Sequence, residues 1–329
     1  MTDELTADRH LRSPAPGDLA AARDLLERII ENLGLVMHAP RVALEHAAVC
    51  LVAEGHLIIE DFPGVGKTTL AKALARSVGC SFSRIQFTPD LLPSDVTGVN
   101  MFSQQTGEFE FRPGPVFANL LLVDEINRAS PKTQAALLEC MQELQVTVDG
   151  VSYELAPPFM VMATQNPIEY EGTYPLPEAE LDRFALRISV GYPEFGDEAQ
   201  MLVEQAAGSP LDDLQPVASA EDVLQAIAVA RGMYVEPSMA EYVTRIIRAT
   251  RDDRRLFLGA SPRAGITLLR VAKARALLDG RGYLAPEDVK NVAGAVLGHR
   301  LLLSPEARAA AIEPPELVEE ILGRLPVPA

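Results

Sequence analysis

One segment of this 329-residue chain restricts its fold more than any other: the run Glu60–Thr69, EDFPGVGKTT. It follows a short β-branched strand candidate, His56–Glu60, and opens a helix candidate, Thr68–Val78. A strand, a glycine-rich loop and a helix in this order are the context that a phosphate-binding loop requires. Gly64 and Gly66 let backbone N–H groups approach phosphate oxygens, and the amino terminus of the helix favours an anion.

Within this loop we expect Lys67 to reach the β- and γ-phosphates of a nucleotide and the Thr68 hydroxyl to bind Mg²⁺. The loop departs from the pattern GxxxxGK[ST] at its first glycine, which falls on Asp61. Aspartate tolerates unusual backbone angles better than most residues, so the loop can keep its shape. A glycine-rich turn without a ligand is the alternative. The candidate nucleotide-binding residues are Asp61, Pro63, Gly64, Val65, Gly66, Lys67, Thr68 and Thr69.

A second motif follows farther along the chain. Leu120–Val123 is a continuous apolar strand candidate, and Asp124 and Glu125 come directly after it. Ligands of parallel sheets lie at the carboxyl ends of the strands. We therefore expect Asp124 to hold magnesium and Glu125 to orient and deprotonate an attacking water. The alternative is a strand followed by an acidic helix cap, but the two motifs in this order predict a hydrolase that uses ATP and Mg²⁺.

Further candidates define the fold class. Phe159–Thr164 and Ala185–Val190 are apolar strands, and Pro131–Leu144 is a helix that Ser130 is placed to cap. Continuously apolar strands that alternate with helices predict an α/β fold of the P-loop NTPase type, with helices on both faces of a parallel sheet. Asn166 follows the strand Phe159–Thr164, where an amide can hydrogen-bond the γ-phosphate or the attacking water. Because Asn-Pro is also an ordinary turn signal, the residues alone leave this role open.

Two hairpins interrupt this pattern. One is Val146–Leu155, which turns at Asp149-Gly150, and a weaker one is Val99–Phe111. From about Glu198 onward the strands stop and only helix patterns follow. We expect three regions: a flexible N-terminal tail (residues 1–16), an α/β nucleotide-binding domain with both hairpins (17–210) and a smaller all-α lid domain (211–329).

Composition and charge limit the kinds of partner and compartment that we expect. The net charge of −17 argues against binding to nucleic acid, which depends on Lys and Arg contacts to phosphate. No apolar run is long enough to span a bilayer, so no membrane insertion is expected. The first ten residues lack the basic and then apolar layout of a secretory signal, and the three cysteines form no CxxC pair. These features favour a cytoplasmic protein with reduced thiols.

Three segments together resemble one known family. FRPGP (Phe111–Pro115), LVDEINRA (Leu122–Ala129) and ATQNPIEYEGTYPLPEAELDRF (Ala163–Phe184) are closely similar to the MoxR family of AAA+ ATPases. The resemblance covers roughly residues 30 to 302 and is most specific across Gln104–Pro193. An aspartate at the position of Asp61 is also familiar there. One departure is Val-Met-His at residues 36–38, where members usually show Val-Gly-Gln near the adenine.

The resemblance implies roles that spacing alone does not supply. Asn166 matches the sensor-1 position, Arg183 the arginine finger that enters a neighbouring subunit's site, and Arg263 the sensor-2 position at the start of a lid helix. With Glu125 these are the candidate catalytic residues. Without the family, Arg183 would be an ordinary surface residue and Arg263 an ordinary first-turn residue. The hairpins Val99–Phe111 and Val146–Leu155 match the helix-2 insert and the pre-sensor-1 hairpin.

The resemblance also implies a function: ATP hydrolysis by a homo-oligomer, usually a hexameric ring. Such a ring acts as a chaperone that remodels or activates partners, often ones with a von Willebrand factor A domain. The main alternative is an AAA+ motor or loader that acts on nucleic acid, which the acidic composition disfavours. A nucleotide-gated scaffold without hydrolysis fits poorly with Glu125, Asn166 and Arg183 together. A small-molecule kinase fits poorly with the long helical region.

Overall fold

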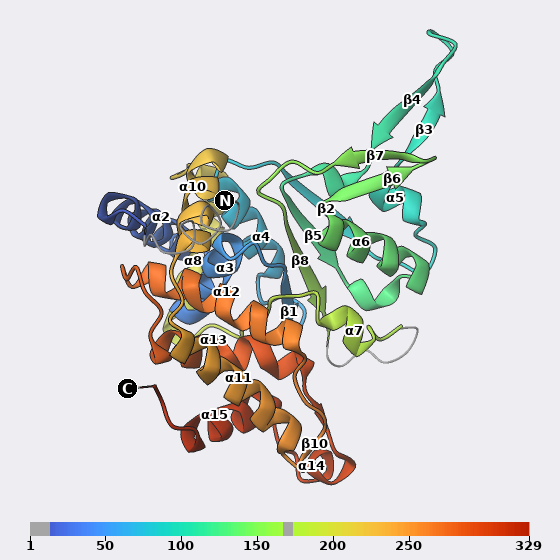
Figure 1. The fold of residues 1–329 in the computed structure, drawn as a ribbon. Helices are drawn as coiled ribbons and strands as arrows, with labels where there is room; N and C mark the ends of the chain where they lie inside the picture. Colours follow the sequence, from blue (N-terminus) through green and yellow to red (C-terminus); the bar gives the residue numbers. More distant parts are fainter. Residues whose placement is uncertain (1–13, 167–173, 329) are drawn as a thin grey trace, which may run out of the picture.

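The computed structural model describes residues 14–166 and 174–328 (Figure 1). Most of the expected N-terminal tail, and the part of the family motif from Pro167 to Thr173, lie outside the described residues. Within them, helices α2 (Pro16–Gly34) and α3 (Arg41–Val52) precede the first strand.

The central sheet has five parallel strands in the order β2-β5-β8-β1-β9. The parallel pairing confirms the predicted parallel sheet. It also brings the carboxyl ends of β2, β5, β8 and β1 to the same edge of the sheet. The strands are β1 (Leu57–Glu60), β2 (Phe82–Gln86), β5 (Leu120–Asp124), β8 (Met160–Gln165) and β9 (Leu186–Ile188).

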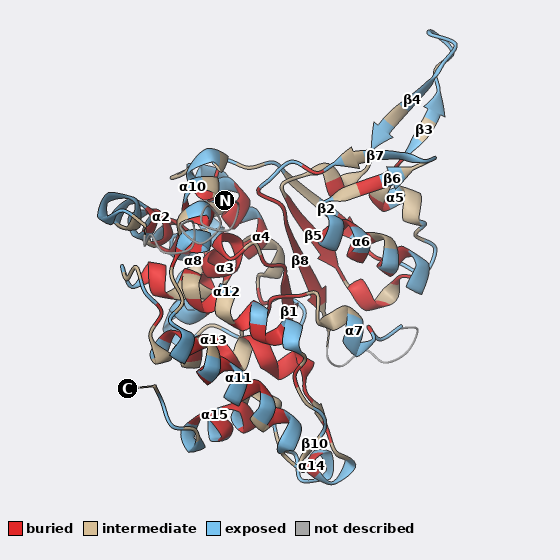
Figure 2. Cartoon of the chain, in the orientation of Figure 1, coloured by how far each residue is buried: buried red, intermediate tan, exposed pale blue. Residues whose placement is uncertain are grey.

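Side chains alternate between the two faces of this sheet. On β5, Leu120 and Leu122 pack with the core that α2, α3 and α4 (Lys67–Ser77) share. The intervening Leu121 and Val123 pack into a second core with α6 (Pro131–Glu143). Because every β5 residue is buried, both faces are covered (Figure 2), which explains why the strand sequence is apolar without interruption.

Both predicted hairpins are present. One pairs β3 (Gly98–Phe102) with β4 (Phe109–Pro113), and the other pairs β6 (Gln145–Val148) with β7 (Val151–Glu154). Asp149 and Gly150 both have positive φ, at 50° and 82°, as a tight turn between twisted strands requires. The β3–β4 hairpin projects away from the sheet and is largely exposed (Figures 1 and 2). Rings of Phe111 and Tyr153 stack at a centroid distance of 4.0 Å, so the two hairpins meet at the base.

The remaining elements are mostly helical. The short α7 (Glu178–Leu181) precedes β9, and α5 (Pro93–Thr97) precedes β3. The helices after β9 are α8 (Phe195–Ala207), α9 (Pro210–Asp213), α10 (Ala220–Gly232), α11 (Pro237–Asp252), α12 (Pro262–Leu278), α13 (Pro286–Leu297), α14 (Pro305–Ala309) and α15 (Pro314–Arg324).

One feature of this region differs from the expected end of all strands near residue 198. A small antiparallel pair joins β10 (Leu256–Leu258) to β11 (Leu302–Leu303) beside the short 3₁₀ turn η3 (Gly298–Arg300). These strands have three and two residues, too short to show a period of two in the sequence.

The helical region packs directly on the first part of the chain. Helix α12 contacts α2 and α3, and residues of α10, α12 and α13 share one continuous apolar core with β1, β5 and α4. The boundary near residue 210 therefore remains a prediction. Across the described stretches, no helix is both long and apolar enough to cross a membrane.

Candidate functional site

A cleft of about 340 Å³ lies at the carboxyl edge of the sheet. Three strands contribute residues at or just after their ends: Gln86 ends β2, Asp124 ends β5, and Asn166 directly follows β8. The loop between β1 and α4 closes the other side. The cleft is lined by Pro63, Gly64, Gly66, Lys67, Thr68, Arg84, Gln86, Asp124, Glu125, Thr164 and Asn166.

The loop has the backbone that its glycines allow. Gly64 and Gly66 have φ of +88° and +90°, values that side chains with a Cβ rarely adopt. Gly66 is also the N-cap of α4, so the helix begins at the cleft. Its first N–H groups have no partner within the helix and can bind an anion there. A Cβ at Gly66 would come within 3.3 Å of the Met37 Cε atom, so the Met37 side chain lies against the loop. Beside it, the His38 Nε2 atom lies 2.8 Å from a Glu204 carboxylate oxygen of α8.

Lys67 lies where a phosphate would meet it. Its Nζ donates a 2.6 Å hydrogen bond to the Asp61 carbonyl oxygen. Burial lowers the pKa of Lys67, while the charges of Asp61, Asp124 and Glu125 oppose that shift. The ammonium is therefore held among carboxylates, ready to exchange a loop carbonyl for phosphate oxygens.

Asp61 has a role that the sequence did not suggest. Its Oδ2 atom accepts hydrogen bonds from the Val190 and Gly191 N–H groups at 2.7 and 2.8 Å and from the Ser189 hydroxyl at 3.0 Å. Its Oδ1 atom accepts from the Phe62 N–H at 3.0 Å. The side chain thus ties the loop to the chain after β9. The expected tolerance of unusual backbone angles is not what Asp61 provides, since it is not one of the described residues with positive φ.

Replacing Asp61 by asparagine is expected to lower the free energy of unfolding by about 1.5–3 kcal/mol near neutral pH, because hydrogen bonds to a charged group are lost or weakened. Burial raises the pKa of Asp61, but the bonds from Gly191, Ser189, Phe62 and Val190 outweigh it, and the pKa is lowered. The stabilisation is then complete above the unfolded pKa of about 3.9 and disappears as pH falls through the lower folded value.

Urea unfolding of both proteins between neutral and acid pH measures this difference. The stability gap should close on acidification. A gap that stays constant down to the lowest pH would mean that the Asp61 charge does not stabilise the loop. Asp90→Asn, the same substitution at an exposed aspartate, is a suitable control.

Asp124 and Glu125 are connected through Thr164. The Thr164 hydroxyl donates to the Asp124 Oδ1 atom at 3.2 Å and accepts from the Glu125 N–H at 2.9 Å. The Arg84 Nε lies 2.6 Å from the Asp124 Oδ2 atom, and the Gln86 amide donates to the Glu125 Oε2 atom at 2.6 Å. Both carboxylates therefore have fixed positions at the floor of the cleft.

Glu125 also has an unusual backbone. Its φ and ψ are 55° and 52°, in the left-handed region that costs energy for a residue with a side chain. Such strain is retained where the surrounding structure determines the conformation and is concentrated at functional sites. Here Thr164 holds the N–H, while Gln86 and the Arg128 Nε, 3.2 Å from Oε2, hold the carboxylate.

The residues present fit a magnesium ion that is bound together with phosphate. Thr68 and Asp124 supply an alcohol and a carboxylate oxygen to the same cleft. Mg²⁺ usually takes only one or two protein oxygens and completes its shell with water and phosphate. No group of three or more His, Cys, Asp or Glu side chains in the described parts of the chain forms a metal site by itself.

Three residues of this cleft were missed from the sequence: Arg84, Gln86 and Thr164. The signal that could have found them is register. Gln86 pairs with Asp124 across β2 and β5, and Val123 pairs with Ala163 across β5 and β8. Once the strand order is known, Thr164 must lie beside Asp124.

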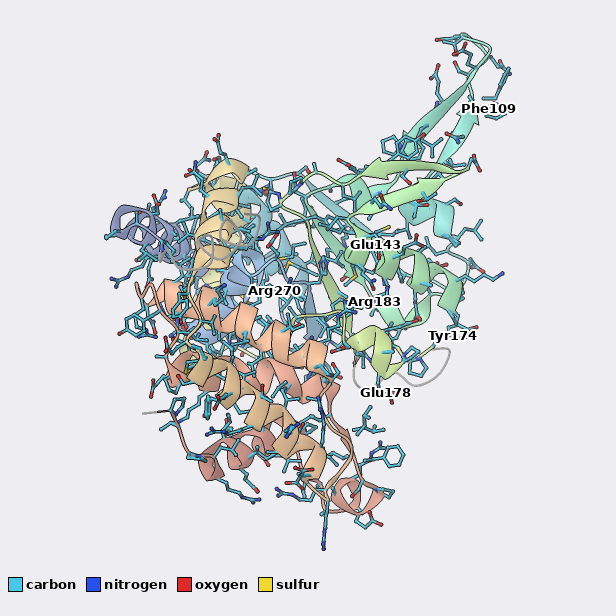
Figure 3. All side chains as sticks on the ribbon, viewed as in Figure 1. Phe109, Glu143, Tyr174, Glu178, Arg183 and Arg270 are labelled. Carbon is cyan, nitrogen blue, oxygen red and sulfur yellow. The ribbon has the colours of Figure 1, made fainter. Side chains whose placement is uncertain are left out.

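Arg183 and Arg263 lie elsewhere. Together with Arg270 they line a second cavity of about 230 Å³, which shares no lining residue with the first cleft. Figure 3 shows Arg183 next to α7 and Arg270 on α12. Among the described contacts none of these three guanidinium groups has a hydrogen bond or an ion pair, and the Glu54 carboxylate in the same wall is engaged by Arg231. The structure therefore places both arginines away from their own chain's phosphate-binding loop.

Comparison with known proteins identifies the family. Residues 56–186 match the model of the ATPase family associated with various cellular activities (AAA), and residues 248–321 match the AAA lid domain. Chaperone MoxR1 of Mycobacterium tuberculosis is 41% identical over 98% of this chain and 89% of its own length. The chain belongs to the MoxR family of AAA+ ATPases.

Two other proteins are similar over nearly the whole chain. YeaC of Bacillus subtilis is 48% identical over 92% of this chain and 95% of its own length. The crystal structure of a candidate ATPase from Cytophaga hutchinsonii superposes with a TM-score of 0.88 at 37% identity, covering 95% of this chain and 98% of that one. The AAA+ fold predicted from the sequence, a P-loop sheet followed by a helical lid, is thus confirmed.

Proposed function

We propose that this MoxR-family protein is a Mg²⁺-dependent ATPase whose hydrolysis drives a ring-forming chaperone. The observation that supports it most directly is the shared cleft, where Lys67, Thr68, Asp124, Glu125 and Asn166 surround the same space. A nucleotide phosphate placed there meets helix N–H groups, an ammonium group and two carboxylates in one site.

Each residue then has a distinct role in hydrolysis. Lys67 and the loop N–H groups bind the β- and γ-phosphates, and Asn166 orients the γ-phosphate or the water. Thr68 and Asp124 would hold Mg²⁺, which neutralises charge on the phosphate oxygens when bound. Glu125 accepts the proton of the attacking water at a carboxylate oxygen, where Gln86 now donates. In this proposal Asp61 anchors the loop, while Pro63, Val65 and Thr69 complete its shape.

Phosphate release from purified protein tests the activity directly. We expect turnover with Mg-ATP, loss of turnover with EDTA and loss of tight ATP binding in Lys67→Ala. Lys72→Ala, five residues later on the same helix, is the matched control because it keeps the loop intact. Normal ATP affinity of Lys67→Ala in calorimetry would contradict the assignment of the loop.

A ring explains where the arginines act. Arg183 and Arg263 do not line their own chain's cleft, so in a head-to-tail assembly they are proposed to serve the neighbour's nucleotide. A head-to-tail interface that closes on itself produces a ring, most simply the hexamer usual for the family. Light scattering should show ATP-promoted hexamers; a monomer at micromolar concentration with Mg-ATP would refute the ring.

The chaperone role is the part that depends most on relatives, one of which is named Chaperone MoxR1. We propose that the ring remodels protein partners, including ones with a von Willebrand factor A domain, in the cytoplasm, where ATP is available. Pull-down with Glu125→Gln in ATP should retain such partners. Salt-sensitive retention on DNA would instead favour the nucleic-acid motor, which the charge of −17 disfavours.

A further inference from the structure

A buried arginine holds the segment that carries Arg183. Arg300 of η3 is only 6% exposed. Its Nε donates to the Asp182 carboxylate at 2.7 Å, and its Nη2 donates to the Asp182 carbonyl oxygen at 3.2 Å and also to the Phe184 carbonyl oxygen. Its Nη1 donates to the Ala185 carbonyl oxygen at 3.2 Å. Both neighbours of Arg183 are therefore fixed by one planar group from the lid.

The same carboxylate reaches the start of α12. The Asp182 Oδ2 atom accepts a 3.1 Å hydrogen bond from the Ser261 hydroxyl. Ser261 is the N-cap of α12, and its oxygen also accepts from the Ala264 N–H at 3.1 Å. Arg263 is the second residue of that helix. One carboxylate thus connects the backbone beside Arg183 to the cap of the helix that carries Arg263.

This connection is rigid for a physical reason. A guanidinium group has five donors in a fixed plane, and Arg300 directs them to the Asp182 carboxylate and to carbonyl oxygens on two sides of Arg183. Because the group is desolvated, any displacement leaves a buried charge or a buried carbonyl without a partner. The neighbouring His299 adds a further bond, with its Nε2 atom 3.1 Å from the Phe184 carbonyl oxygen.

We propose that Asp182 and Arg300 are positioning residues that hold Arg183 and Arg263 in one arrangement, so that both reach the neighbouring subunit's nucleotide together. This inference rests on the proposed function of the two arginines in a ring. Neither Asp182 nor Arg300 touches nucleotide in it. They act through the two arginines, and their loss should slow hydrolysis in the neighbour's site while their own site continues to bind ATP.

A purely structural role is the competing explanation, because the same bonds also join the lid to the sheet. The two explanations differ in which subunit is damaged. A general loss of stability lowers ATP binding and hydrolysis in the variant subunit's own site. Misplaced arginines lower only hydrolysis in the neighbouring subunit's site. A displacement of about 1 Å in a catalytic group can lower the rate by about 10²-fold.

The test is ATP turnover of Asp182→Asn, which keeps the shape of the side chain but removes its charge. We expect turnover to fall about 10- to 100-fold with ATP affinity within about threefold of wild type. Mixed with Glu125→Gln under conditions of subunit exchange, Asp182→Asn should regain activity above either variant alone. Ser261→Ala, which removes one of the bonds to Asp182 together with the cap bond from the Ala264 N–H, should lose turnover less and be rescued in the same way.

A matched control exists in the same lid. Asp288 is fully buried, ion-paired with Arg281, and caps α13 through the Ala285 N–H. Asp288→Asn should lower the melting temperature. Any loss of turnover in this variant should not be recovered by mixing it with Glu125→Gln.

Three outcomes overturn the proposal: turnover of Asp182→Asn and Ser261→Ala at the wild-type rate, a loss of ATP binding in step with turnover, or no gain on mixing. Arg183→Ala, measured in parallel, distinguishes a failure of the proposed function from a failure of the positioning role. If that variant also turns over normally, the proposed function of Arg183 fails; if only the Asp182 and Ser261 variants are normal, the positioning role alone fails.

Discussion

Glu125→Gln is expected to bind Mg-ATP with near wild-type affinity and to hydrolyse it about 10²- to 10⁴-fold more slowly. The amide keeps the shape of the side chain, and its oxygen can still accept from the Gln86 amide, but it cannot take a proton from water. The left-handed backbone of Glu125, with φ of 55°, helps to fix where this group points. Single-turnover hydrolysis and ATP titration measure the two quantities separately.

Glu143→Gln is the control for this variant. Glu143 is an exposed residue at the end of α6, outside the cleft lining, and its change should leave both quantities unaltered. Hydrolysis by Glu125→Gln at a rate close to wild type would remove Glu125 from the role of base.

Arg183→Ala is expected to produce the largest loss of rate, about 10³- to 10⁵-fold, again with ATP binding retained. The transition state spreads negative charge over the γ-phosphate oxygens, and a guanidinium meets it with a rigid fork of donors. Three arginines with no described partner share a cavity in which the one carboxylate, Glu54, is already engaged. Such a cluster of like charges attracts an anion.

The exposed Arg245 of α11, which pairs with Glu241 on the same helix, offers a control. Arg245→Ala removes an equal charge without touching the arginine cavity and should hydrolyse ATP normally. Equal losses in both variants would mean that total charge, and not the position of Arg183, sets the rate.

Much of the fold was predictable because local signals and burial agree. The strand β5 is buried on both faces, so its sequence is apolar throughout, and Asp149-Gly150 adopts the positive φ values that make this pair a turn signal. Proline at the first position and serine at the N-cap likewise mark the start of α6. The helices α14 and α15 were not predicted, although each also begins with proline.

The candidate site was predictable only in part, because several of its residues reach their positions through long-range contacts. Lys67 and Asp124 follow from motifs, whereas Thr164 enters through strand register and Asp61 acts through residues 189–191, more than a hundred positions away in the chain. The convergence of Arg183 with Arg263 depends on how the lid packs, for which neither segment carries a local signal.

The most direct test of a site completed by a neighbouring subunit is a mixture of Glu125→Gln and Arg183→Ala under conditions of subunit exchange. With random order around the ring, about a quarter of interfaces pair an intact Glu125 with an intact Arg183. We predict that ATP turnover of the equal mixture rises clearly above that of either variant alone. If Arg183 instead acts within its own subunit, every subunit carries one lesion in its own site, and turnover of the mixture would stay at the level of the separate variants.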